Sequence, residues 1–74
     1  MSTDTYANLI GVVIEKLIQT HKELQFNYEG LSSILGSHSE EERASVPELI
    51  TMAELRDGYL ELLQSLEKRF PGVK

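Results

Sequence analysis

Two histidines, His21 and His38, are the only imidazole side chains in this chain of 74 residues, which contains no cysteine. A zinc site needs three or four ligands at constrained spacing, and neither histidine has a histidine or cysteine partner three or four residues away. We therefore expect no metal site and no cofactor. His38 is expected to be solvated, whereas His21 lies at the edge of an apolar helical arc and is expected to be partly buried, with a structural role.

Three carboxylates, Glu54, Asp57 and Glu61, lie on one side of a helix predicted over residues 46–70. They could suggest acid–base catalysis, but they lie opposite the apolar side of that helix and no nucleophile accompanies them. We expect no catalytic residues, and the chain is not expected to be an enzyme.

The segment 28–50 imitates a helix-turn-helix, because a short helix and a glycine precede a candidate recognition helix that starts near Ser39. That helix would present Glu40, Glu41 and Glu42 to DNA phosphates, with only Arg43 of favourable charge. The net charge of −5 also disfavours binding to phosphates. Nucleic acid is not expected as a partner, although a transcriptional regulator that uses this segment remains an alternative.

Three side chains are candidates for contact with a partner: Tyr28, Arg56 and Tyr59. Both tyrosines can keep a polar tip at a surface, and Gly58 leaves bare backbone beside Tyr59 in mid-helix. Arg56 falls inside an apolar arc, where its stem could cover apolar surface or its guanidinium could pair with a carboxylate across an interface.

The stretch from Ser45 to Phe70 positions most of these residues and is predicted as one long helix. Ser45 and Glu48 have the spacing of a capping box, and Pro47 suits the first turn. Pro71 cannot prolong the helix, so it should stop near Phe70. Its apolar residues form two adjacent stripes over roughly half the circumference: Leu49, Ala53, Leu60 and Leu63, then Met52, Leu55, Tyr59, Leu62, Leu66 and Phe70.

A first helix is predicted over residues 4–25, also with two apolar stripes. One follows heptad spacing and is expected to pack along the Ser45–Phe70 helix: Tyr6, Ile10, Val13, Leu17 and Leu24. The other contains small residues and is assigned to a subunit contact: Ala7, Gly11, Ile14 and Ile18. Alternatively, Gly11 is only tolerated in the helix interior, and Ile14 and Ile18 cover a short middle helix.

Between the long helices, a short helix is predicted over residues 28–35, with Asn27 as its cap. Gly36 is expected to end it in the left-handed conformation. An acidic segment follows over residues 36–45 and is expected to be an exposed loop or a frayed helical turn. The predicted fold class is therefore all-α, with two long amphipathic helices and a short middle helix in a single domain, residues 1–74.

A chain this small buries only about 60% of the surface that it exposes when unfolded, and no disulfide can supplement its core. We therefore expect a helical bundle that is completed by homodimerisation. The apolar arcs place this dimer interface at nine positions: Ala7, Gly11, Ile14, Ile18, Met52, Leu55, Tyr59, Leu62 and Leu66.

No apolar run approaches the roughly 20 residues that cross a bilayer. The first residues lack the charged region of a signal peptide, and the absence of cysteine fits a reducing compartment. We expect a soluble, cytoplasmic protein with no membrane partner.

The segments NLIGVVIEKLIQ and GLSSILGSHSE carry Leu9, Ile10 and Gly11, then Val13 and Leu17, and later a short amphipathic stretch that ends in a helix-capping residue. This pattern resembles the enterobacterial family of biofilm and acid-resistance regulators that includes YmgB/AriR, YcgZ and YmgA. The resemblance covers about half of the chain. It implies an all-helical homodimer that acts as a connector on two-component signalling, chiefly the Rcs phosphorelay.

The function expected from the sequence is regulation by protein–protein interaction, as a dimeric connector or modulator of bacterial signalling, biofilm formation or stress response. The partner would be another regulatory protein. Besides the transcriptional regulator, a phage-borne or secretion-associated antagonist or chaperone remains open, because it would share the same architecture.

Overall fold

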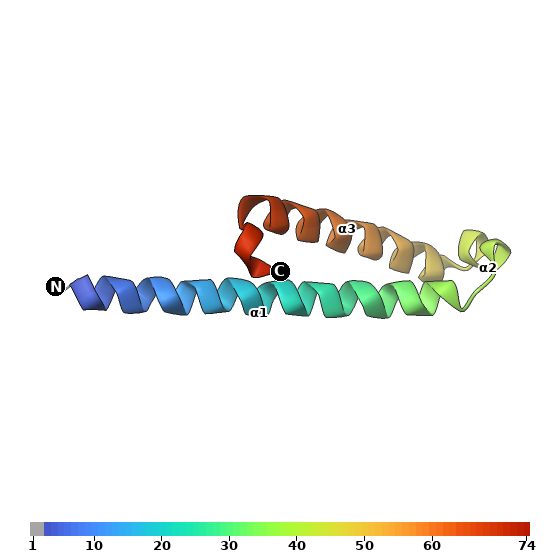
Figure 1. Ribbon diagram of the computed structural model, residues 1–74. Coiled ribbons are helices and arrows are strands. Elements are labelled where there is room, and N and C mark those ends of the chain that lie inside the picture. The colour runs from blue at the N-terminus through green and yellow to red at the C-terminus, as the bar shows by residue number, and fades with distance from the viewer. Residues whose placement is uncertain (1–2) are drawn as a thin grey trace.

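The computed structural model describes residues 3–74, which form three α-helices and a short 3-10 turn, with no strand in this range. In chain order these are α1 (Thr3–Gly36), α2 (Glu40–Ser45), α3 (Pro47–Arg69) and η1 (Pro71–Val73). α1 and α3 pack as an antiparallel hairpin with α2 at its closed end (Figure 1). The molecule is 60 Å long and 17 Å in the other two directions. The prediction of an all-α fold is confirmed.

α1 is one uninterrupted helix of 34 residues, so the predicted separate helix over residues 28–35 is wrong. Asn27, its predicted cap, instead donates a hydrogen bond to the Tyr59 hydroxyl at 3.4 Å. No proline breaks the segment, and Gly30 costs a helix only about 1 kcal/mol. The helix does end at Gly36, as predicted. The predicted left-handed conformation of Gly36 is wrong: no glycine among residues 3–74 has a positive φ.

The segment 36–45, predicted as an acidic loop or a frayed turn, contains the six-residue helix α2. A capping box begins this helix. The Glu42 amide donates to Ser39 Oγ at 3.2 Å, and the Ser39 amide donates to Glu42 Oε1 at 3.1 Å. Both bonds satisfy amides that a helix start leaves without intrahelical partners.

The capping box predicted at Ser45 and Glu48 is wrong. Ser45 is the last residue of α2, and its hydroxyl donates to the Glu41 carbonyl at 2.8 Å. The extended Val46 precedes α3 instead, without a side-chain cap, and Pro47 takes the first position of the helix as predicted. α3 ends at Arg69, where the sequence also predicted the end.

Most of the buried and half-buried side chains of α1 form one line, which we call the seam. They follow heptad spacing of three and four residues: Leu17, His21, Leu24, Tyr28, Leu31 and Leu35. From the other side α3 contributes the buried Leu49 and Leu63, and η1 contributes Val73. The core is therefore a single two-helix seam closed at one end by η1.

The predicted intramolecular stripe of the first helix is wrong for three of its five members. Tyr6, Ile10 and Val13 are 53%, 60% and 50% exposed, whereas Leu17 and Leu24 are half-buried. The reason is length. The 34 residues of α1 span about 51 Å and the 23 residues of α3 only about 34 Å, so α3 does not reach the first turns of α1.

We expect Ser39→Ala to lower the free energy of unfolding by about 1 kcal/mol, because it removes the cap of α2. Ser45→Ala, at the exposed other end of the same helix, should change it by less than about 0.5 kcal/mol. Urea denaturation followed by circular dichroism measures both. Equal effects of the two substitutions would contradict the assigned capping box.

Candidate functional site

The first turns of α1 extend beyond the end of α3 (Figure 1). We call residues 3–16 the overhang. All of its residues are exposed, and six of them are large apolar side chains with exposed fractions from 49% to 60%: Tyr6, Leu9, Ile10, Val12, Val13 and Ile14. The overhang is thus the largest concentration of exposed apolar side chains on the described part of the chain.

The seam continues into the overhang without a change of spacing. Counting back from Leu17 in steps of three and four leads to Ile14, Ile10, Ala7 and Thr3. The side of α1 that α3 covers over its second half is therefore uncovered over its first half.

The overhang is also apolar on the side opposite the seam. Leu9 and Val12 lie there, and they are 60% and 53% exposed. Between residues 3 and 14 the only charged side chain is Asp4. A helix normally buries its apolar sides against neighbouring elements, yet no other element among residues 3–74 packs on the overhang.

Three of the four predicted interface residues of the first helix lie on the overhang. Ala7, Gly11 and Ile14 are exposed, and a Cβ built on Gly11 would meet nothing within 4 Å. Ile18 is half-buried, just inside the part of α1 that the rest of the chain covers.

The predicted interface residues of the second long helix divide by exposure. Met52, Tyr59 and Leu66 are half-buried, whereas Leu55 and Leu62 are 52% and 55% exposed. The last two are seven residues apart and so share one side of α3. They form a second, smaller apolar strip.

The candidates for partner contact are engaged within the chain. Tyr28 is half-buried in the seam, and the hydroxyl of Tyr59 accepts the hydrogen bond from Asn27. Arg56 Nη2 lies 3.2 Å from Asp57 Oδ1, on a neighbouring exposed carboxylate of the same helix. Arg56 therefore pairs with a carboxylate of its own helix, and not with one across an interface.

Within the described range 3–74, His21 is the only buried polar residue, at 4% exposed, which agrees with the expected partial burial. Its Nε2 lies 2.7 Å from Glu67 Oε2, and Lys74 Nζ lies 3.4 Å from Glu67 Oε1. This cluster joins α1, α3 and the residue after η1 at the point where the overhang begins. Glu67 could not be identified from the sequence, because a contact between residues 46 positions apart leaves no local signal.

The hydrogen bond with His21 lowers the pKa of the Glu67 carboxyl from its ordinary value of 4.5, and the Lys74 ammonium lowers it further. A similar but exposed contact joins His38 Nδ1 and Glu42 Oε2 at 3.5 Å. The pKa of Glu42 is lowered mainly by its hydrogen bonds with the Ser39 amide and hydroxyl.

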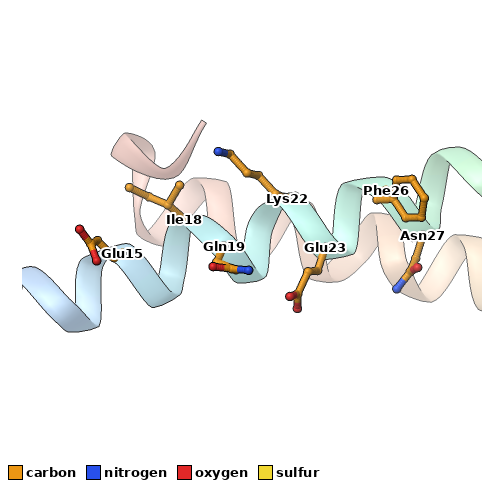
Figure 2. A pocket seen from close by; sticks show the side chains of 7 residues that line it. All are labelled: Glu15, Ile18, Gln19, Lys22, Glu23, Phe26 and Asn27. Atoms are coloured by element: carbon orange, nitrogen blue, oxygen red, sulfur yellow. The ribbon is translucent and has the colours of Figure 1, made fainter.

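Figure 2 shows a hollow of about 740 Å³ on the described surface. All seven side chains that line it come from α1: Glu15, Ile18, Gln19, Lys22, Glu23, Phe26 and Asn27. They spread along one helix and do not converge on one point (Figure 2). A reaction site needs groups that converge from several directions, and this hollow lacks them.

The other sequence candidates for chemistry are exposed. Glu54, Asp57 and Glu61 lie on the open side of α3, and Glu40, Glu41 and Glu42 on α2. Among residues 3–74, no three His, Asp or Glu side chains come together in a way that could hold a metal ion. No helix in this range has the length and apolar character needed to span a bilayer.

Comparison with known proteins adds no relative: no family model, no curated protein and no solved structure matches the chain. The resemblance to the YmgB/AriR family remains a prediction from the sequence. Among the surfaces described above, the overhang is the strongest candidate for a functional site.

Because the folded-state pKa of Glu67 is lowered, its contact with His21 stabilises the protein above pH 4.5, and this contribution is lost as the pH falls through the lowered value. We expect Glu67→Gln to reduce the loss of stability between about pH 6 and about pH 3. Urea midpoints at the two pH values measure the effect, with Glu61→Gln, an exposed glutamate of the same helix, as the control. An unchanged pH dependence in Glu67→Gln would contradict the assignment.

Proposed function

We propose that this protein is a small non-enzymatic regulator that acts as a homodimer by binding another protein. One observation carries the proposal: the overhang presents six large apolar side chains, each about half exposed or more. Monomeric soluble proteins rarely expose a contiguous apolar patch of this kind, and such patches typically mark contacts with other proteins.

Secondary-structure physics supports the same proposal. An isolated helix shorter than about 12–15 residues is only marginally stable in water, and most helical stability in proteins comes from packing of an apolar side. The overhang continues a formed helix and so needs no nucleus of its own, but no other described element packs on it. Another molecule that packs on it would supply the missing stabilisation.

The overhang has two apolar sides, so it can contact two different molecules. One neighbouring helix covers only one side of a helix, and the overhang is apolar on both its seam side and the side of Leu9 and Val12. We assign the seam side to a second copy of the chain and the side of Leu9 and Val12 to the target protein.

The resemblance to the YmgB/AriR family supports a cytoplasmic connector or modulator of bacterial signalling, biofilm formation or stress response. The net charge of −5 and the three exposed glutamates of α2 favour a protein target over a nucleic acid.

The experiment is affinity capture from an extract of the native host, with the full chain and two double variants as bait. In the first variant Leu9→Asp and Val12→Asp place charges on the proposed target side. In the second, Leu55→Asp and Leu62→Asp place the same charges at equally exposed positions of α3. A protein that the wild type retains is then purified and titrated against all three by calorimetry.

We expect the target to bind the wild type and the α3 variant, and to bind the overhang variant at least about 30-fold more weakly, because a buried apolar anchor is replaced by a charge. A target that binds all three baits equally would contradict the assigned surface. If the wild type retains no protein that binds it in purified form, the regulatory function is wrong.

A further inference from the structure

The continuous seam of α1 also indicates the direction and the register in which a second copy would pack. This inference rests on the homodimer proposed above. We propose that two chains pair antiparallel through their overhangs, so that each overhang covers the seam where the partner's own α3 ends. The pair would be a rod two helices thick, in which the second copy's α1 continues the line of the first copy's α3.

The antiparallel direction follows from the position of α3. α3 lies on the seam side of α1 from Leu17 to Leu35. In a parallel pair the two α3 helices would lie at the same end, between the two α1 helices, and would force them apart. In an antiparallel pair they lie at opposite ends, and the seam sides of both overhangs remain free to meet.

Charge favours the same direction. Between residues 3 and 14 only Asp4 is charged, so the contact itself buries almost no charge. Each copy carries a net charge of −5, with three glutamates in α2 at the closed end of the hairpin. The antiparallel pair places these acidic ends at the two far ends of the rod, which minimises their repulsion.

The end of α3 also sets the register. Seam positions of antiparallel helices meet in layers, and one register places Ala7 against Ile10 of the second copy and Thr3 against its Ile14. If the second copy were moved by one heptad toward the α3 of the first copy, its first turn would collide with η1, where Val73 is buried against the hairpin. If the second copy were moved by one heptad away from that α3, it would no longer cover Ile10 and Ile14 of the first copy.

The chosen register therefore fills the seam from Thr3 to Leu35 without overlap. It puts the two-fold axis between residues 8 and 9, and it pairs the small Ala7 with the large Ile10 on both sides of that axis. Leu9 and Val12 stay on the outer surface near the middle of the rod, so each copy offers one apolar site to a target, on opposite faces of the pair.

The register is tested by distances between spin labels on the two copies. The chain has no cysteine, so Asn8→Cys, Gln19→Cys and Phe26→Cys each provide one attachment point at an exposed position of α1. Each residue away from the axis adds about 3 Å to the separation along the rod, because both helices advance 1.5 Å per residue. We expect separations along the rod of about 2 Å, 31 Å and 52 Å for the three positions.

Three results would overturn the arrangement. Equal short distances at all three positions would indicate a parallel pair, and a shortest distance at Gln19 would indicate two hairpins that overlap along their whole length. Light scattering that shows only monomer at micromolar concentrations would remove the homodimer as well. The capture experiment on Leu9 and Val12 reports separately on the target, so it distinguishes failure of the arrangement from failure of the proposed function.

A matched pair of substitutions tests the seam. Ile10 and Leu9 are both 60% exposed in the single chain, so a monomer predicts the same effect of a charge at either position. We expect Ile10→Asp to raise the dissociation constant of the dimer at least about 30-fold and Leu9→Asp to change it by less than about 3-fold. Similar dissociation constants for the two variants, measured by sedimentation, would overturn the seam assignment.

Discussion

The apolar seam of α1 needs a cover along its whole length, and α3 covers only the part from Leu17 to Leu35. This mismatch in length determines the other features of the molecule. It leaves an apolar overhang at one end, and it places the C-terminal turn η1 at the boundary between covered and uncovered seam. The proposed second copy and the proposed target are both consequences of that uncovered half.

Polar contacts fix where the cover begins and ends. At the closed end of the hairpin, Arg43 Nη1 donates to the Leu35 carbonyl at 3.1 Å and so satisfies one of the last carbonyls of α1. At the other end, the buried His21 meets Glu67, which also contacts Lys74. The first contact joins α2 to α1 and the second joins α3 to α1, so both favour the register in which α3 leaves the overhang uncovered.

The sequence predicted the features that depend on local chemistry. Pro47 and Pro71 mark the ends of α3, and the absence of strand periodicity indicates an all-α fold, which the structure confirms. The capping box was placed wrongly because Ser39 and Glu42 have the same spacing as Ser45 and Glu48, and only the fold decides which pair caps a helix.

The features that depend on contacts between distant residues could not be predicted in the same way. The seam runs through His21, a polar residue whose burial depends on Glu67 in another helix, so the apolar pattern suggested Tyr6 and Val13 on the seam side. The seam defined by the structure passes through Ala7 and Ile14 instead. The predicted first helix was too short, because Asn27 was expected to cap a new helix. In the structure the Asn27 side chain instead donates a hydrogen bond to the Tyr59 hydroxyl.

Amide hydrogen exchange across residues 7–16, measured from about 1 µM to about 100 µM protein, tests most directly whether another chain covers the overhang. If it does, these amides become more protected as the concentration rises, while the amides of residues 24–35 stay equally protected throughout. Protection of residues 7–16 that does not change with concentration would contradict the account, because the overhang would then be held, or left open, by the single chain alone.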